Sequence, residues 1–337
     1  MNIKEYFSLK FEDDKLIFLD QTGLPLSEDY IVTDDYEVIA KGIEELCIRG
    51  APAIGIAAAY SVALAFKNNN VLDDNYFDFV FKRIESTRPT AVNLFYALNK
   101  VKNVYKSLNS SSNVYNSLLE CAKEVHEEDI IKCENIAING LRIFKKKSTV
   151  LTHCNTGKLA TGGIGTALSV IINAYKNNLV EFVYADETRP LMQGSRLTAF
   201  ELKKNEIPFA INVDSAAAFL MQQNKIDLVI VGADRIAKNG DSANKIGSYN
   251  LAVNCKYHKI PFYIAAPIST IDLNCSNGKN IPIEERSKFE ISRISNLKFT
   301  KSNYPVYNPA FDVIPSELID AIITDKGVFT YPYNFDV

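Results

Sequence analysis

The sequence predicts an α/β protein in which a mainly helical domain with a short β element precedes a doubly wound parallel-sheet domain. The first observation is length, since 337 residues suit two domains of roughly 150 residues each. The second is that apolar residues recur at helical spacing before about residue 147. The third is that short apolar runs alternate with helical patterns after it, which is typical of a parallel sheet covered on both faces. We place the helical domain at residues 1–130 and the sheet domain at residues 131–337.

The first domain is predicted to be built mostly from helices. In order, the expected elements are a short strand pair at 11–20, helices at 35–46 and 52–66, and one or two long amphipathic helices at 112–144. The segment Pro52–Phe66 is almost entirely apolar and has a proline in its first turn. We therefore expect it to form a helix that is buried on all sides.

Six apolar runs predict the strands of the second domain, at 148–153, 181–185, 208–212, 227–232, 261–265 and 319–324. Helical patterns separate them, for example at 160–176 and 243–257. In open sheets of this kind, ligands bind at the carboxyl edge, so the residues that follow each strand are candidates for a site.

Composition restricts the classes of function. The net charge of −3 gives no electrostatic footprint for nucleic acid. No apolar stretch reaches the ~18 residues of a membrane helix, and the charged N-terminal sequence is unlike a signal peptide. We therefore expect a soluble, cytoplasmic protein that binds neither nucleic acid nor membranes. The six cysteines are scattered, so we expect reduced thiols and no structural zinc site.

His153, Cys154 and Asn155 directly follow the first run of the predicted sheet. Cys154 could be a buried inert thiol, a metal ligand or a reactive group. A helix is expected to begin near Ala160, and a helix N-terminus lowers the pKa of a thiol beside it. The glycines of this stretch match neither the dinucleotide-binding nor the phosphate-loop pattern, so we expect them to allow close helix–sheet packing.

Asp234 follows the fourth run, at the same edge of the sheet as Cys154. It could cap a helix, bind a ribose or act as a general acid in a closed apolar pocket that raises its pKa. Asn244 and Lys245 are expected near the start of the next helix, where N–H groups and a lysine bind anions; a solvated helix start is the alternative. Together these groups favour a site for a polar, anionic small molecule.

Two arginines of the first domain stand in turns that lead into proline-started helices. Arg49 is followed by Gly50, whose bare backbone can approach a phosphate, and Arg88 stands in a similar turn. Each could also be an ordinary surface charge. Two such turns suggest a phosphate clamp between the domains.

Several long motifs occur together and in one order, among them "IRGAPAIGIAAAY", "STRPTAVNL", "DETRPLMQGSRLTAFEL", "GADRIAKNGDSANKIGSYNLAV" and "NPAFDVIP". With them the chain resembles the methylthioribose-1-phosphate isomerases over nearly its whole length. The resemblance implies a helical N-terminal domain, a Rossmann-like C-terminal domain and a homodimer, with no metal or nucleotide cofactor. It also implies the conversion of a small-molecule sugar phosphate, 5-methylthio-ribose 1-phosphate, to 5-methylthio-ribulose 1-phosphate in methionine salvage.

The resemblance further implies the roles of individual residues. The family's catalytic cysteine falls on Cys154 and its catalytic aspartate falls on Asp234. Its substrate-binding residues fall on Arg49, Gly50, Ala51, Arg88, Gln193, Asn244 and Lys245. Gln193 is the one that the strand-end argument did not single out. Lys158 departs from the small or neutral residue that is usual at its position.

The implied chemistry starts from a phosphate on the anomeric oxygen, which keeps the ring from opening to a free aldehyde. We assign protonation of the ring oxygen to Asp234. Hydrogen then moves from C2 to C1, either as a proton with Cys154 as base or as a hydride beside Cys154. We favour the hydride, since no strong second base matches.

Two rival substrates are 5-deoxyribose 1-phosphate and ribose 1,5-bisphosphate, and Lys158 hints at the second. A more remote alternative is a non-catalytic regulatory subunit of the initiation-factor exchange complex, a branch that lacks the Cys and Asp pair.

Overall fold

The computed structural model describes residues 5–89, 91–294, 297–298, 300–301 and 303–335. The chain forms two compact units: unit 1 comprises Met1–Glu134 and Gly157–Gly165, and unit 2 comprises Asn135–Thr156 and Thr166–Val337. The chain therefore passes between the units three times, because the short segment 157–165 returns to unit 1. The domain boundary expected between residues 130 and 131 remains a prediction.

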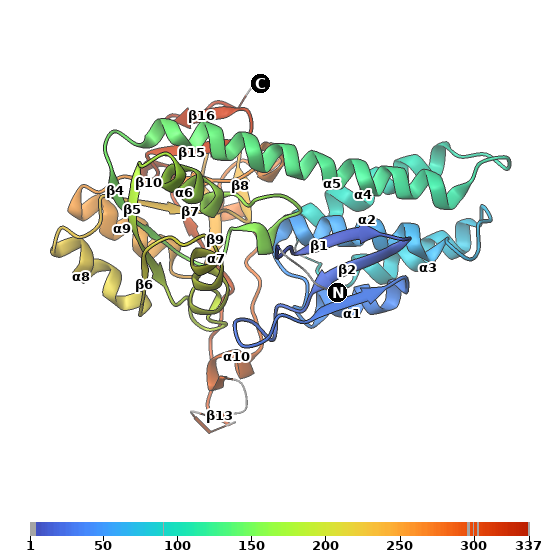
Figure 1. Ribbon diagram of the computed structural model, residues 1–337, viewed down its shortest axis with the longest axis horizontal. Coiled ribbons are helices and arrows are strands. Elements are labelled where there is room, and N and C mark those ends of the chain that lie inside the picture. The colour runs from blue at the N-terminus through green and yellow to red at the C-terminus, as the bar shows by residue number, and fades with distance from the viewer. Residues whose placement is uncertain (1–4, 90, 295–296, 299, 302, 336–337) are drawn as a thin grey trace. The chain divides into compact units, whose positions relative to one another are not determined.

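Unit 1 combines a small antiparallel sheet with a group of helices. Its strands are β1 (Leu9–Glu12), β2 (Lys15–Leu19) and β3 (Tyr30–Thr33). Its helices are α1 (Tyr36–Glu44), α2 (Ala51–Ala65), α3 (Asp74–Glu85), α4 (Val92–Ser107) and α5 (Val114–Asn139), whose last residues belong to unit 2 (Figure 1). Helix α2 is buried continuously from Ala53 to Ala65, as expected for a helix of almost only apolar residues.

Unit 2 is built on a sheet with the strand order β16-β15-β10-β7-β4-β5-β6 within the described residues. Its parallel strands are β4 (Ser148–Thr152), β5 (Val180–Asp186), β6 (Phe209–Asn212), β7 (Leu228–Val231), β10 (Phe262–Ala265) and β15 (Ala321–Thr324), and β16 (Gly327–Thr330) is antiparallel. Each of the six predicted runs forms one parallel strand, which confirms the predicted α/β class. Numbered along the chain, the parallel strands follow the doubly wound order 3-2-1-4-5-6.

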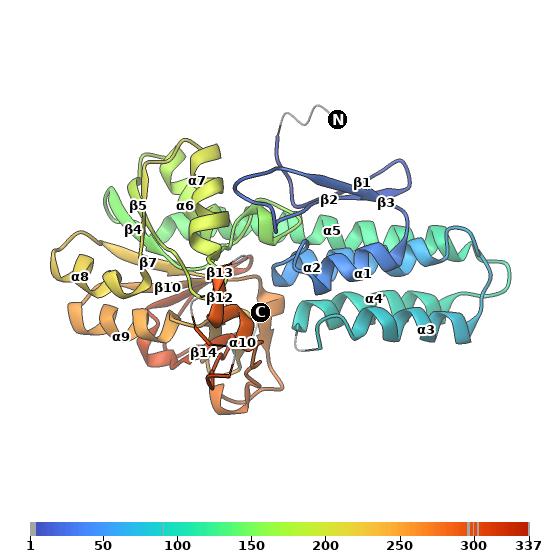
Figure 2. The ribbon, with the colours of Figure 1, turned by 90° about the horizontal axis from the view of Figure 1, so that it is seen from below.

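Helices cover both faces of this sheet. They are α6 (Ala167–Lys176), α7 (Ala199–Lys204), α8 (Ala217–Gln222) and α9 (Ser248–His258). Because side chains alternate along a strand, Val150 packs into a core shared with α6 and α7, and Leu151 packs into a second core shared with α8 and α9. Figure 2 shows α6 and α7 on one side of the sheet and α8 and α9 on the other.

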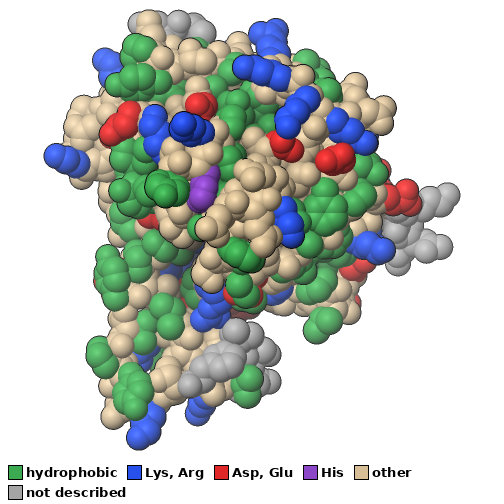
Figure 3. Space-filling view, turned by 90° about the vertical axis from the view of Figure 1, so that its left-hand side faces the viewer, with side chains coloured by type: hydrophobic (Ala, Val, Ile, Leu, Met, Phe, Trp, Pro, Cys, Tyr) green, Lys and Arg blue, Asp and Glu red, His purple; other side chains and the backbone are tan. Residues whose placement is uncertain are grey.

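Apolar side chains are scattered among charged ones on the side of the molecule where α8 and α9 lie (Figure 3). On these two helices Phe219, Val253 and Tyr257 are exposed. In the described part of the chain, none of the helices combines the length and apolar character needed to cross a bilayer.

Two expected helices begin later than the sequence indicates. The segment expected to be helical from residue 160 contains a single 3₁₀ turn, Lys158–Ala160, and α6 begins only at Ala167. The segment 243–257 starts as strand β9 (Ser242–Lys245) before α9 begins. Strand β9 pairs with β8 (Arg235–Ala237) and β14 (Phe311–Ile314), and these ladders override the helical pattern of its residues.

Candidate active site

The order of the strands reverses between β4 and β7, which are neighbours in the sheet. Ligands of open α/β sheets bind in the crevice outside the carboxyl ends of the strands at such a switch point. Cys154 lies two residues beyond the end of β4, and Asp234 lies three residues beyond the end of β7. The two predicted catalytic residues therefore flank the switch point.

Cys154 has a left-handed backbone, with φ of 65°. This conformation costs an L-residue about 1–2 kcal/mol, so the surrounding structure must hold it. The Cys154 N–H donates to Thr188 Oγ1 at 2.8 Å, and its carbonyl accepts from Thr198 Oγ1 at 2.5 Å. The Cys154 side chain is partly exposed, whereas the other five cysteines are buried. The helix expected at Ala160, close behind Cys154, is wrong, because a loop occupies that place.

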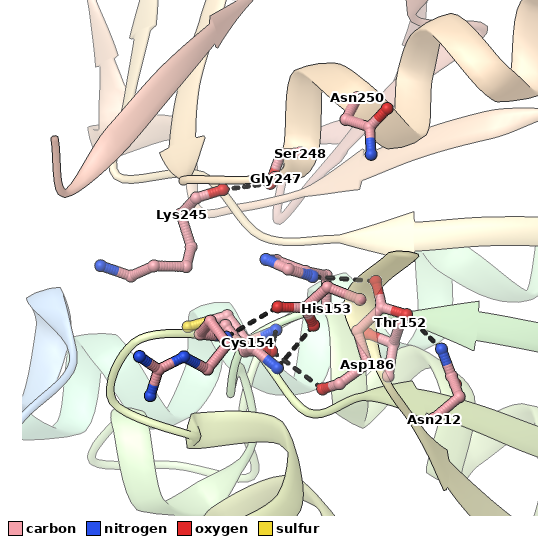
Figure 4. Close-up of polar contacts among 12 residues, drawn as sticks. Thr152, His153, Cys154, Asp186, Asn212, Lys245, Gly247, Ser248 and Asn250 are labelled. Carbon is pink, nitrogen blue, oxygen red and sulfur yellow. Dashed lines mark hydrogen bonds and ion pairs between the residues drawn. The ribbon is translucent and has the colours of Figure 1, made fainter. Parts of the chain in front are cut away.

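His153 is buried in a network at the ends of β4 and β5, with 1% of its surface exposed. Its Nε2 lies 2.9 Å from the carbonyl of Ile246, and its Nδ1 lies 2.9 Å from Asp186 Oδ2. Asn212 Nδ2 donates to the other oxygen of Asp186 at 2.7 Å (Figure 4). Burial works to lower the pKa of His153, but the hydrogen bond and charge of Asp186 outweigh it and the pKa is raised. For Asp186, burial disfavours the ionised carboxylate and raises its pKa.

Within the described residues, His153, Asp186 and Asp214 could offer three metal ligands whose atoms lie within 4.8 Å of one another. These atoms are instead engaged in hydrogen bonds. The Asp214 carboxylate accepts the N–H groups of Thr188 and Arg189, each at 2.7 Å. The distance of 2.9 Å between Nδ1 and the Asp186 carboxylate is also that of a hydrogen bond. The group therefore acts as a hydrogen-bonded support for the strand ends.

A small hairpin brings Asp234 close to Asn244 along the backbone. The Asp234 N–H donates to the carbonyl of Ala243 at 2.9 Å, which extends the pairing of β8 with β9. Asn244 and Lys245 are the last two residues of β9, and α9 begins three residues after Lys245, so the two residues lie close to the start of the helix but outside it. Figure 4 shows the Lys245 side chain and the Cys154 sulfur extending to the same side of the His153 network.

The N-terminus of α9 is capped by a carboxylate. Asp312 accepts the N–H groups of Gly247 at 2.8 Å and Tyr249 at 2.9 Å. These two N–H groups are therefore bound to a carboxylate, and the anion site expected beside Lys245 cannot use them. The Lys245 ammonium group donates to the carbonyl of Ala310 at 3.0 Å.

Gln193 is buried and directly precedes a π-helical turn, Gly194–Thr198. Gly194 packs so closely on the end of β5 that a Cβ would lie 1.6 Å from the carbonyl oxygen of Asp186. Thr198, at the end of the turn, binds the carbonyl of Cys154. Gln193 is thus held near the ends of β4 and β5, although no pattern in the sequence places it there.

The predicted residues of unit 1 gather at one end of a helix pair. The turn 49–51 leads into α2, and Arg88 precedes α4. Gly55 of α2 lies against Asn93 of α4, where a Cβ would be 2.5 Å from the Asn93 carbonyl oxygen. Because Gly55 and Asn93 are near the starts of their helices, the two arginine turns lie at the same end of the pair.

The glycine-rich loop 157–165 packs on helices of unit 1. A Cβ on Gly162 would lie 2.5 Å from the ring of His126, and a Cβ on Gly163 would lie 3.0 Å from Cys133 Cβ. Both partners belong to α5. The expected helix–sheet packing of these glycines is therefore wrong, because they allow a loop to approach a helix.

Lys158 of the same loop is paired with the N-terminal segment. Its Nζ donates to Glu5 Oε1 at 2.7 Å and lies 5.4 Å from the centre of the Tyr6 ring. The hint of a second anion site thus loses its support.

Four residues of the network beside Cys154 carry no functional signal of their own in the sequence: His153, Asp186, Thr188 and Asp214. A histidine at one strand end and an acid at the end of the next strand are the signals that could have indicated a pair.

Comparisons with known proteins agree with this architecture. The model of the initiation factor 2 subunit family matches residues 47–331. A methylthioribose-1-phosphate isomerase of Heliobacterium modesticaldum is 48% identical over 332 residues, covering 97% of this chain and 96% of the relative. A crystal structure of 5-methylthioribose 1-phosphate isomerase from Pyrococcus horikoshii has a TM-score of 0.91 and 37% identity, covering 98% of this chain and 94% of its own. A crystal structure described as subunit delta of the translation initiation factor eIF-2B, from A. fulgidus, has a TM-score of 0.85 and 39% identity, covering 98% and 97%.

Proposed function

The chain belongs to the initiation factor 2 subunit family and, within it, to the methylthioribose-1-phosphate isomerases, and we propose that it is an aldose–ketose isomerase of methionine salvage. Its substrate is 5-methylthio-ribose 1-phosphate and its product is 5-methylthio-ribulose 1-phosphate. The observation that carries the proposal is that Cys154 and Asp234 follow neighbouring parallel strands at the switch point of the sheet.

The proposed reaction begins with Asp234 as general acid. Asp234 gives its proton to the ring oxygen as the bond from that oxygen to C1 breaks. The hydrogen of C2 then moves with its electron pair to the electron-poor C1. Cys154, as the thiolate, accepts the proton of the C2 hydroxyl as the ketone forms and becomes a thiol. The phosphate stays on C1 throughout.

Substrate C2 deuteration distinguishes this route from proton abstraction. Hydride transfer keeps the deuterium on C1 of the product formed in ordinary water. An enediol route with Cys154 as base exchanges it with solvent. Product whose C1 carries no deuterium would therefore exclude the hydride step.

Substrate binding is proposed for residues of each unit. In unit 2 these are Gln193, Asn244 and Lys245, whose support is their closeness to the strand ends. In unit 1 they are the turn 49–51 and Arg88, whose support is that both arginine turns lie at one end of the α2–α4 pair. Arg88→Lys should raise KM more than it lowers kcat, because lysine keeps the charge but loses the paired donors of arginine.

The central experiment compares kcat/KM for the 5-methylthio, 5-deoxy and 5-phospho sugars on the purified chain. We expect the 5-methylthio sugar to be preferred. Asp234→Asn and Cys154→Ala should each lower kcat by about 10²–10⁴-fold with unchanged thermal unfolding. Cys121→Ala, on α5, is the matched control and should keep its activity. A chain that turns over none of the three sugars would favour the alternative of a non-catalytic subunit of a translation initiation factor, the kind of protein named for the A. fulgidus structure.

We also propose that the protein is a cytoplasmic homodimer. The support is the family resemblance. Light scattering on the purified protein should give twice the mass of one chain, and cell fractionation should recover the protein with cytosolic markers. A mass equal to one chain at micromolar concentration would contradict the dimer.

A further inference from the structure

His153 connects the two groups of proposed site residues within unit 2. It directly precedes Cys154 in the chain, and its ring contacts the segment that follows Lys245. We infer that His153 is a positioning residue whose Nδ1 side fixes the backbone that carries Cys154 and whose Nε2 side fixes the segment that carries Lys245. The changes in kcat and KM that test this inference are measured in the proposed isomerase reaction, so this part of the inference rests on the proposed function.

The Nδ1 side supports the left-handed backbone of Cys154. Nδ1 is bonded to the Asp186 carboxylate, and the carbonyl of the same Asp186 accepts a hydrogen bond from Thr188 Oγ1 at 2.9 Å. Thr188 Oγ1 in turn accepts the N–H of Cys154. Asp186 is therefore linked to this part of the chain in two ways: its carboxylate contacts the His153 ring, and its carbonyl contacts the Cys154 N–H through Thr188. Without these hydrogen bonds, the strained φ of Cys154 would relax toward an ordinary value and redirect its thiol.

The Nε2 side sets the path of the chain between Lys245 and α9. A carbonyl can only accept, so Nε2 carries a proton and donates it to Ile246. The next residue, Gly247, has φ of +106°, and a Cβ there would lie 3.0 Å from the Cε1 atom of the His153 ring. The ring thus lies against the bare backbone of Gly247. Any rotation of the imidazole would displace the segment that Lys245 begins.

The ring has one orientation that satisfies both partners. Turning it over would present carbon atoms to the Asp186 carboxylate and to the Ile246 carbonyl, and leaving such buried groups unsatisfied costs about 1–3 kcal/mol each. With 1% of its surface exposed, His153 itself does not face substrate. Its effect on the reaction must therefore pass through Cys154 and Lys245.

Two substitutions separate the two sides. The amide of His153→Asn can reach the position of Nδ1 and keep the bond to Asp186, but it loses Ile246. The amide of His153→Gln can reach the position of Nε2 and keep the bond to Ile246, but it loses Asp186. We expect His153→Asn to raise KM roughly tenfold with a smaller change in kcat, and His153→Gln to lower kcat roughly tenfold with a smaller change in KM.

A second readout needs no substrate. Cys154 is the partly exposed cysteine, so iodoacetamide should modify it first, and peptide mass spectrometry measures the rate. We expect the rate to change about fivefold or more in His153→Gln and about twofold or less in His153→Asn. If the wild-type chain isomerises none of the sugars, the proposed function fails, and the alkylation rates still test the positioning of Cys154.

Asp186→Asn is the conservative variant that keeps the folded network. Its amide can donate to Nδ1 of a neutral His153 and its oxygen can accept from Asn212, so kcat, KM and alkylation should stay near wild type. His258→Asn and His258→Gln, at the end of α9, are matched controls and should change none of these quantities. Equal effects of the two His153 substitutions on kcat and KM, or alkylation rates in both that match wild type, would overturn the inference. So would an Asp186→Asn variant as impaired as His153→Gln.

Discussion

Replacing Gly50 with alanine tests the turn that leads into α2. Gly50 has φ of 92° and ψ of 133°, a combination that side-chain-bearing residues rarely adopt. A Cβ there would lie 2.3 Å from the carbonyl oxygen of Ala160 and 2.4 Å from its Cα. Because non-bonded carbon atoms prefer about 3.5–4.0 Å, either the turn or the loop 157–165 must move by roughly 1 Å.

The expected cost has two parts. The positive φ costs about 1–2 kcal/mol by itself. Forcing a methyl group against backbone atoms adds about 1–3 kcal/mol, so the total is about 2–5 kcal/mol. Gly327→Ala is the matched control, since Gly327 has φ of +148° but, apart from its chain neighbours, no atom of the described residues lies within 4 Å of its added Cβ. Gly327→Ala should therefore lose only the ~1–2 kcal/mol that the positive φ costs.

Thermal unfolding measured by calorimetry provides the assay. A loss of 1 kcal/mol lowers Tm by roughly 2–4 °C for a domain of about 150–250 residues. Gly50→Ala should therefore lower Tm by several degrees more than Gly327→Ala does. If the two variants unfold at the same temperature, the steric argument for the contact between Gly50 and Ala160 is refuted.

Three further predictions concern single side chains. Asp129 accepts the N–H of Gly162 at 2.7 Å, and burial raises the pKa of its carboxyl group. The contribution of Asp129 to the free energy of unfolding is therefore fully present below its unfolded pKa of about 4. It is lost as pH rises through the higher pKa of the folded state. The Tm of Asp129→Asn relative to wild type should accordingly increase from pH 4 to pH 8, and a decrease would contradict this sign. Asn155→Ala removes a donor 2.7 Å from the fully buried Glu201 and should cost about 1–3 kcal/mol in urea unfolding; a loss below about 0.5 kcal/mol would argue against that bond. Lys158→Ala breaks an ion pair whose acid is 79% exposed, so it should cost less than about 1 kcal/mol. It should also leave the preference among the three sugars unchanged, whereas a selective loss with the bisphosphate would restore the second anion site.

The strands β4, β7, β10 and β15 of the parallel sheet were predictable because they are covered on both faces. Such strands are short, almost wholly apolar runs, as in Leu228–Val231. The strand β9 was not predictable, since it contains Asn244 and Lys245 and owes its form to pairing with β14, whose paired residues lie 66 to 72 positions further along the chain. Local periodicity carries no information about such a distant partner.

The candidate site shows the same division. Cys154 and Asp234 could be proposed from the sequence because residues after parallel strands meet at one edge. Gln193 could not, because its position depends on how closely Gly194 approaches β5. The partners of His153 are 33 and 93 residues away in the chain, so its network became visible only in three dimensions.

The return of residues 157–165 to unit 1 has a consequence for how this protein can be recombined with its relatives. A chimaera that exchanges unit 1 as a single N-terminal block would keep the recipient's own glycine loop and set it against a foreign α5. The residues of the foreign helix at the positions of His126 and Asp129 would then contact a loop from a different protein. An exchange that respects the units needs three junctions, after residues 134, 156 and 165. The last two junctions enclose a nine-residue cassette that begins three residues beyond Cys154. Transferring the whole of unit 1 to a relative therefore also transfers residues 157–165, the segment that follows closely after the proposed catalytic thiol of Cys154.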